Sequence, residues 1–195
     1  MAGRRFSQAI SEGDGISVVV EVRDLEGART AASDGAEAIA LRAELAGVRD
    51  ATELPILWRA PGPAADAADA GADAWLLVVA DHGDGDDRLV ELHREALEWG
   101  LDCVVEVRNE DEIDRALEEL DPEIFLLSGA AEEGTDLLSV ALDLLPDVPA
   151  GKLAVADIPV LSREQVDELE RAGVDAVIVG VRDVASLVGD AHPPV

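Results

Sequence analysis

The sequence predicts an α/β fold, a single compact (β/α)8 TIM barrel with shortened loops. Eight short apolar runs recur along the 195 residues, and stretches with helical periodicity lie between most of them. Two connectors are also similar to each other, and each joins a helix end to an apolar run. They are Ala-Gly-Ala-Asp-Ala at 70–74 and Ala-Gly-Val-Asp-Ala at 172–176. A doubly wound open sheet normally has fewer strands and is the alternative fold.

The eight apolar runs have the lengths of strands and are separated by turn-forming or helical segments. In chain order the expected strands are Ile16–Val22, Ala38–Leu41, Leu54–Trp58, Ala74–Val79, Cys103–Val107, Ile124–Leu127, Leu153–Ala156 and Ala176–Val179.

Helical periodicity is clearest in three of the intervening segments, which are Asp87–Trp99, Glu110–Leu120 and Ser162–Ala172. Ser162 followed by Gln165 has the pattern of a capping box at a helix start. Gly100 and Gly173 follow two of these segments and are natural helix stops. The pattern therefore predicts helices with defined ends on both sides of the later strands.

The remaining helices are expected to be short. Asp24–Gly35 leaves little room for a full first helix, and Ala60–Asp69 predicts a short, alanine-rich third one. A typical barrel of this kind has about 250 residues, and few have less than about 200. We therefore expect one domain over residues 1–195 with trimmed loops, and a flexible tail at about 189–195.

The tryptophans Trp58, Trp75 and Trp99 are expected to pack in the core or between helices and sheet, and so is His93. His82 lies in an acidic, glycine-rich segment at 81–87. A calcium loop also needs a correctly placed bidentate glutamate, which is missing there. We therefore interpret this segment as a solvated loop.

The charge of the chain is extreme. Forty-three acidic residues against fifteen basic ones give a formal net charge of −28, spread along the sequence. The apolar content of 48% argues against disorder. Self-repulsion of this charge is strong in dilute buffer, but at about 1 M salt the Debye length falls to about 3 Å and screens it. With Lys152 as the single lysine, the composition resembles that of halophilic cytoplasmic proteins.

Several classes of function are disfavoured by composition. The sequence has no basic patch and no aromatic platform for nucleic acid, and no apolar run of membrane-spanning length. Cys103 is the single cysteine, so neither a disulfide nor a zinc framework is expected. We expect a cytoplasmic protein without a signal peptide, a metal or a cofactor; the sequence leaves the oligomeric state open.

A phrase that occurs twice is the strongest pointer to a site. Glu21 and Arg23 end one apolar run, and Glu106 and Arg108 end another in the same Val-Val-Glu-Val-Arg order. Residues two apart on a strand point to the same side, so each pair projects in one direction. In a barrel of parallel strands such pairs reach the mouth. The alternative is an exposed surface ion pair on an edge strand.

At the level of whole motifs, the chain resembles the indole-3-glycerol phosphate synthase family. The likeness runs from about residue 5 to 188 and is strongest in three segments. Leu-Asp-Cys-Val-Val-Glu-Val at 101–107 is similar to the family's L-D-A-L-V-E-V-H, and Ser-Arg-Glu-Gln-Val at 162–166 to its T-R-E-D-V. Ala-Val-Ile-Val-Gly at 176–180 is similar to A-V-L-V-G. The resemblance implies a TIM barrel and a carbon–carbon lyase of tryptophan biosynthesis.

The resemblance also implies the catalytic positions. It places the family's carboxylates at Glu21 and Glu106 and a shortened acid at Asp157, while both lysine positions hold arginine, Arg23 and Arg59. In the family, one lysine acts as general acid on the departing hydroxyl. A lysine can be tuned by burial toward neutral pKa, whereas arginine, at about 12.5 or above, effectively cannot give up its proton.

The phosphate site implied by the resemblance is altered too. Gly180 and Arg182 after the last strand, with Ser128 and Gly129 after the sixth, are the candidate anion-binding residues. Proline at 159 replaces the family's phosphate-loop glycine, and it removes a backbone N–H donor there. The residue that falls where the family has a substrate-packing phenylalanine is Pro61.

Three functions remain open at this stage. The first is a charged pocket that binds a small anionic metabolite through arginine, without efficient synthase activity. The second is a non-catalytic scaffold or regulator, in which Glu21 pairs with Arg23 and Glu106 pairs with Arg59. The third is a genuine synthase, which the missing proton donor disfavours.

Overall fold

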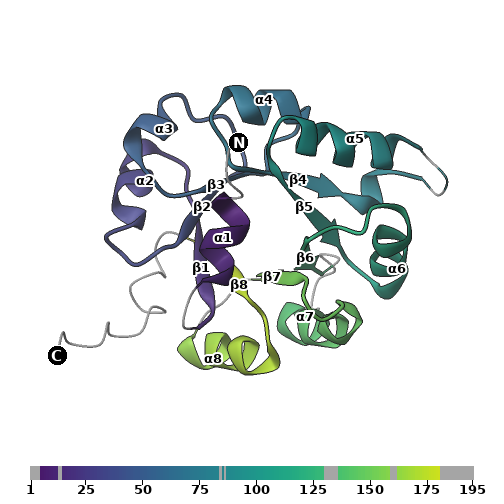
Figure 1. Cartoon of the computed structure of the whole chain (residues 1–195). Coiled ribbons are helices and arrows are strands. Elements are labelled where there is room, and N and C mark those ends of the chain that lie inside the picture. The colour runs from purple at the N-terminus through teal and green to yellow at the C-terminus, as the bar shows by residue number, and fades with distance from the viewer. Residues whose placement is uncertain are drawn as a thin grey trace.

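The predicted (β/α)8 barrel is confirmed. A computed structural model of the chain describes residues 5–12, 15–83, 85, 87–129, 136–158 and 162–180. In this part of the chain, eight parallel strands pair in sequence order, and the last pairs with the first to close the barrel (Figure 1). The strands are β1 (Ser17–Glu21), β2 (Ala38–Leu41), β3 (Ile56–Trp58), β4 (Ala74–Val78), β5 (Asp102–Val107), β6 (Ile124–Ser128), β7 (Leu153–Asp157) and β8 (Ala176–Gly180).

The helices surround the strands, as Figure 1 shows, and those before β4 are short. No described helix is long and apolar enough to cross a membrane. The helices are α1 (Arg5–Ser11), α2 (Leu25–Ala31), α3 (Val48–Ala51), α4 (Ala64–Asp69), α5 (Asp87–Glu98), α6 (Glu110–Glu119), α7 (Leu137–Leu144) and α8 (Arg163–Ala172), with 3₁₀ turns at Val79–Asp81 (η1) and Leu145–Asp147 (η2).

The local signals that predicted the helix ends act as expected. The Ser162 side chain accepts a hydrogen bond from the Gln165 backbone N–H, and the Gln165 side chain accepts one from the backbone N–H of Ser162. Gly173 ends α8 with φ at 100°, and Gly100 follows α5 with φ at 77°. Both glycines adopt the left-handed backbone conformation, which glycine reaches without steric strain because it has no Cβ. The expected tail at about 189–195 lies outside the described residues.

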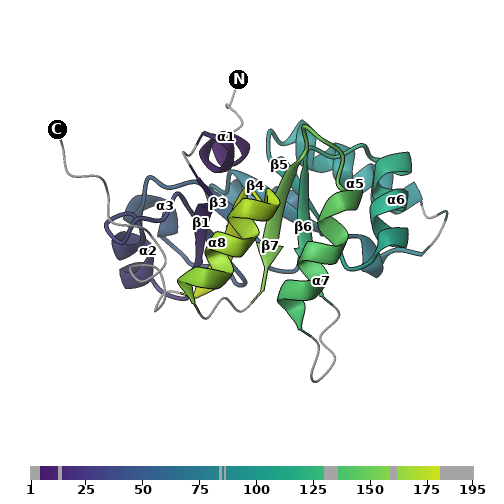
Figure 2. The same cartoon turned by 90° about the horizontal axis from the view of Figure 1, so that it is seen from below.

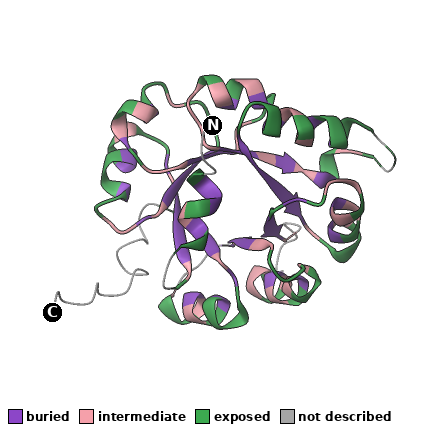
Figure 3. Ribbon diagram, in the orientation of Figure 1, coloured by how far each residue is buried: buried purple, intermediate pink, exposed green. Residues whose placement is uncertain are grey.

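The barrel interior is apolar and is closed at one end by α1. Phe6 and Ile10 of α1 pack against inward-facing residues such as Val19, Leu57 and Val104. Figures 1 and 2 show α1 lying across this end of the barrel. A second, larger cluster lies between the strands and the outer helices. Figure 3 shows the consequence, with buried strands inside and exposed residues on the outward helix faces.

Two buried polar residues at strand starts hold α1 against the N-terminal end of the barrel. The Asp102 side chain, at the start of β5, accepts a hydrogen bond of 2.7 Å from the Ser7 backbone N–H. The Ser17 hydroxyl, at the start of β1, lies 3.5 Å from the carbonyl oxygens of Ala9 and Ile10. Buried polar groups are retained when they are hydrogen-bonded, so these contacts orient α1 as a plug.

A repeated clasp joins neighbouring strands at the same end. Each clasp pairs an acidic residue just before one strand with a residue near the start of the preceding strand. The backbone N–H of the acidic residue donates to the carbonyl of its partner. The carboxylate of the acidic residue accepts a hydrogen bond from the backbone N–H of that partner. The pairs are Glu37 with Val18 (2.7 Å to the carboxylate), Asp73 with Ile56 (3.0 Å) and Asp175 with Ala154 (2.7 Å). Burial raises the pKa of Glu37 and of Asp175, against the opposing effect of these backbone hydrogen bonds. The two repeated connectors of the sequence are therefore two copies of one clasp.

One packing expectation is wrong. Trp58 and Trp75 are buried as predicted, but Trp99 is 51% exposed. The buried face of α5 consists of Leu89, Leu92 and Ala96, whose spacing fits one side of a helix. Trp99 continues the spacing of this face but lies just after the last residue of α5, where its side chain projects into solvent. His93 is half-buried, and burial lowers its pKa.

We predict that Asp175→Ala lowers the free energy of unfolding by about 1–3 kcal/mol, because the buried Ala154 N–H loses its carboxylate acceptor. Asp175→Asn should lose less, because the amide oxygen can still accept this hydrogen bond. Urea denaturation of both variants measures the difference.

The control for this test is Glu168→Ala, which removes an exposed carboxylate from α8 and should change stability by less than about 0.5 kcal/mol. Equal losses in the Asp175 and Glu168 alanine variants would contradict a stabilising clasp.

Candidate functional site

At the C-terminal end of the barrel, the inward-facing sides of β1, β5, β6 and β7 end in a polar or charged residue. Strand register places Glu21 of β1 beside Gly180 of β8, and Ser128 of β6 beside Asp157 of β7. Glu106 of β5 lies opposite Val78 of β4. We call the group of charged and hydrogen-bonding side chains at this end the mouth network. It consists of Glu21, Arg23, Arg42, Arg59, Glu106, Arg108, Ser128 and Asp157.

Arg59 is the buried centre of the mouth network. It directly follows β3, its backbone N–H donates to the Leu41 carbonyl at 2.7 Å, and its side chain is only 3% exposed. Its Nη2 donates to Asp157 Oδ2, and its Nη1 lies 3.7 Å from Glu21 Oε2. Its Nε and Nη1 are buried and have no hydrogen-bond acceptor. Arg59 therefore has two buried donor atoms that no protein group accepts from.

Arg42 is a member of the network that sequence reasoning missed. Its Nε donates to Glu21 Oε2, and its Nη2 lies 3.6 Å from Asp157 Oδ2. Burial acts to lower the pKa of Arg42, but the hydrogen bond from Arg42 to Glu21 and the nearby negative charges raise it overall. A signal was present in the sequence, because Arg42 continues the inward-facing side of β2 two residues after Ala40.

Glu106 belongs to a second arm of the network. It accepts hydrogen bonds from the Ser128 hydroxyl at 2.9 Å and from Arg108 Nη2 at 3.0 Å. The predicted pairing of Glu106 with Arg59 is therefore not what the structure shows. Arg108, two residues along the same strand direction, is close enough to neutralise Glu106 locally, which leaves Arg59 to Asp157 and Glu21.

The other predicted site residues differ in how closely they join the network. Arg23 lies 3.8 Å from Glu21, but its side chain is 88% exposed, so it forms part of the rim. Gly129 lies against α7, where an added Cβ would meet the side-chain end of Leu137. Gly180 is exposed beside Glu21, and Arg182 lies outside the described residues. Their anion-binding role stays a prediction.

The mouth network carries a positive formal charge in a strongly negative chain. Its four arginines and three carboxylates leave one positive charge, whereas the whole chain carries −28. A cleft whose low-dielectric walls hold a local positive charge concentrates field lines and attracts anions. In the described ranges no group of three or more His, Cys, Asp or Glu residues could hold a metal ion. The chemistry favoured here is oxyanion binding through guanidinium.

Lys152 lies at the other end of the barrel. Lys152 immediately precedes β7, and its ammonium pairs with Asp121 Oδ1 at 2.6 Å. The single lysine of the chain is therefore not part of the mouth network.

Sequence comparison finds one matching family and related curated proteins. The model of the family described as indole-3-glycerol phosphate synthase matches residues 43–186. Indole-3-glycerol phosphate synthases from two strains of Acidithiobacillus ferrooxidans are each 34% identical over 140 residues, which is 70% of this chain and 52% of the relative. The chain thus spans about half the length of these relatives. Glu21 and Arg23 lie before the range that the family model matches.

Solved structures of other proteins share the fold. An N-acetylmannosamine-6-phosphate 2-epimerase from Clostridium perfringens aligns with a TM-score of 0.67 and 12% identity, covering 88% of each chain. A 3-hexulose-6-phosphate synthase aligns at 0.65 with 17% identity, covering 89% of this chain and 94% of that one. A tryptophan synthase α-subunit mutant from Pyrococcus furiosus gives 0.65 and 17%, covering 86% and 88%. At these identities the likeness concerns the barrel alone.

We predict that Ser128→Ala lowers the free energy of unfolding by about 1–3 kcal/mol, because the buried Glu106 carboxylate loses its hydroxyl donor. Denaturant unfolding monitored by circular dichroism measures the loss.

A matched control is Ser139→Ala, which removes a hydroxyl that donates to exposed Asp136 at 2.7 Å. This exposed bond should contribute less than about 0.5 kcal/mol. A Ser128 variant as stable as the Ser139 variant would show that the hydroxyl does not support the mouth network.

Proposed function

The chain belongs to the indole-3-glycerol phosphate synthase family, and we propose that it binds a small carboxylate or phosphate anion in the barrel mouth without being an efficient synthase. The observation that carries this proposal is Arg59, whose buried guanidinium has two nitrogens without an acceptor. A buried donor left unpaired costs about 1–3 kcal/mol, so a bound oxyanion that supplies acceptors is favoured.

Electrostatics and geometry support an anion as the ligand. The guanidinium group is planar and permanently charged, and it matches the oxygens of carboxylates and phosphates. Arg59 is almost fully buried, so its attraction for an anion is screened little by solvent. Arg42, which contacts the same carboxylates, provides a second cation at the solvent side of the site.

The proton chemistry of the family is what this mouth lacks. By the resemblance, Arg23 and Arg59 stand where the family has lysines, one of which is a general acid. General acid catalysis works best when the pKa of the donor lies near the working pH, and arginine lies far above it. Glu21 and Asp157 are also already engaged by Arg42 and Arg59. We infer a mouth suited to binding and poorly suited to dehydration.

A second candidate is a non-catalytic scaffold or regulator. It is favoured by the pairing of every carboxylate in the mouth network with at least one arginine. In that case the network has a structural role, and no anion competes for Arg59. A genuine synthase is the third candidate, and family membership alone supports it.

We predict that the protein does not convert 1-(2-carboxyphenylamino)-1-deoxyribulose 5-phosphate, the family substrate, to a fluorescent indole product. Arg59→Lys should give detectable turnover, because lysine can donate a proton when burial lowers its pKa. Steady-state indole fluorescence at high KCl measures both rates, with Arg94→Lys on exposed α5 as the matched control. Turnover by the unaltered protein would restore the synthase assignment.

If neither the unaltered protein nor the Arg59→Lys variant converts the substrate, anion binding distinguishes the anion-binding candidate from the scaffold candidate. Isothermal titration with benzoate and with inorganic phosphate should give heat for the unaltered protein and none for Arg59→Met. If neither probe binds the unaltered protein, the anion site is refuted and the scaffold is favoured.

We also propose that the protein is adapted to a salt-rich cytoplasm, on the basis of its net charge of −28. Raising KCl from dilute buffer to about 1 M should raise Tm, because the Debye length falls to about 3 Å and weakens self-repulsion. Differential scanning calorimetry with sucrose at matched osmolality is the control, since sucrose stabilises folds without screening charge. A Tm that rises equally in both solutes would contradict the charge-screening explanation.

A further inference from the structure

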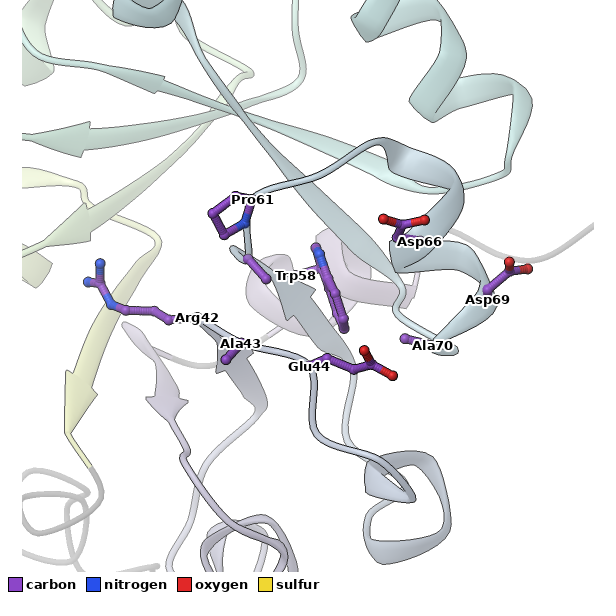
Figure 4. Close-up of a pocket in the computed structure, with 9 residues that line it drawn as sticks. Arg42, Ala43, Glu44, Trp58, Pro61, Asp66, Asp69 and Ala70 are labelled. Atoms are coloured by element: carbon purple, nitrogen blue, oxygen red, sulfur yellow. The ribbon is translucent and has the colours of Figure 1, made fainter.

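A cavity beside the mouth has properties that the mouth network does not explain. It has a volume of about 570 Å³ and lies between the loop after β2, the end of β3 and α4 (Figure 4). Its walls include Glu44, Trp58, Pro61, Asp66 and Asp69. We propose that this cavity binds an organic ammonium ion that also carries a hydrogen-bond-accepting oxygen.

The charge of the cavity favours a cation. Glu44, Asp66 and Asp69 contribute three carboxylates, and none of the three takes part in an ion pair within the described ranges. Arg42 also lines the cavity, but its guanidinium contacts Glu21 and Asp157 of the mouth network. Figure 4 shows this guanidinium directed away from Trp58 and from the acidic residues. The cavity is therefore negative although the adjoining mouth is positive.

A buried donor without an acceptor provides an independent sign of a ligand. Trp58 is 4% exposed, and its indole Nε1 has no hydrogen-bond partner. Figure 4 shows this nitrogen at the edge of the ring that faces the gap between Pro61 and Asp66. Tryptophan N–H groups usually find a partner when buried, so a ligand that reaches this edge must bring an acceptor oxygen.

The carboxylates of the cavity are not arranged as a simple metal site. Metal ions need several oxygen ligands converging within about 2.0–2.6 Å. No group of three acidic, His or Cys residues in the described ranges is placed to hold a metal. The three carboxylates are instead distributed around a space large enough for a small organic molecule. An ammonium group held by Glu44 and Asp66, with an apolar body against Trp58 and Pro61, fits this arrangement.

The test compares two probes that differ in one group, 4-aminobutan-1-ol and butane-1,4-diol, at constant KCl. We expect the amino alcohol, but not the diol, to shift the assigned indole N–H resonance of Trp58 in a ¹H–¹⁵N titration. The double variant Glu44→Gln/Asp66→Asn should weaken this binding by about tenfold, or about 1.4 kcal/mol. The matched control is Glu164→Gln/Glu168→Gln, which removes two exposed carboxylates from α8, on the opposite side of the barrel (Figure 1).

The outcomes discriminate between a site and general surface charge. Binding that weakens only in the Glu44/Asp66 variant supports the proposal. Equal weakening in the α8 variant, an equal response to the diol, or shifts confined to exposed Trp99 would overturn it. Because neither probe is an anion and the readout is at Trp58, the result does not depend on whether the mouth binds benzoate or phosphate.

Discussion

The closed barrel makes the alternation of side chains the constraint on which the rest of the structure depends. Every second residue of each strand must point into one narrow interior, so a strand of five or six residues has a floor, a middle and a mouth position. In β5 these are Asp102, which holds α1, then Val104 in the core, and then Glu106 in the mouth network. Stability and chemistry are thus separated along one strand by steps of two residues.

The arginines of the mouth network determine the physics of this site. Guanidinium groups keep their protons and spread their charge over several donors, so they neutralise neighbouring carboxylates instead of exchanging protons with them. Arg59 is the strongest example, because it is buried between Asp157 and Glu21 and its Nε and Nη1 still have no hydrogen-bond acceptor. The acidic surface has little influence at this depth, since the pairs that decide the local charge lie within about 4 Å of one another.

Most of the fold could be predicted from the sequence because its signals are local: apolar runs, a capping box and helix-ending glycines. The paired motif also located Glu21 and Glu106 at the mouth. The partners could not be predicted, since Arg59 and Asp157 are 98 residues apart and only barrel closure brings them together. Arg42 belongs to no recognisable motif, and only its position two residues after inward-facing Ala40 indicates it. Trp99 was misplaced because its position depends on where α5 ends.

The pairing of β1 with β8 has a consequence for how the protein is made. As the chain leaves the ribosome, β1 is complete long before β8 exists, and its five-residue edge has no partner on one side. Until β8 arrives, the interior that holds Phe6 and Ile10 is open to solvent. Contacts between distant parts of a chain slow folding, and unpaired edges favour aggregation. The net charge of −28 opposes such association between unfinished barrels, because like-charged chains repel one another.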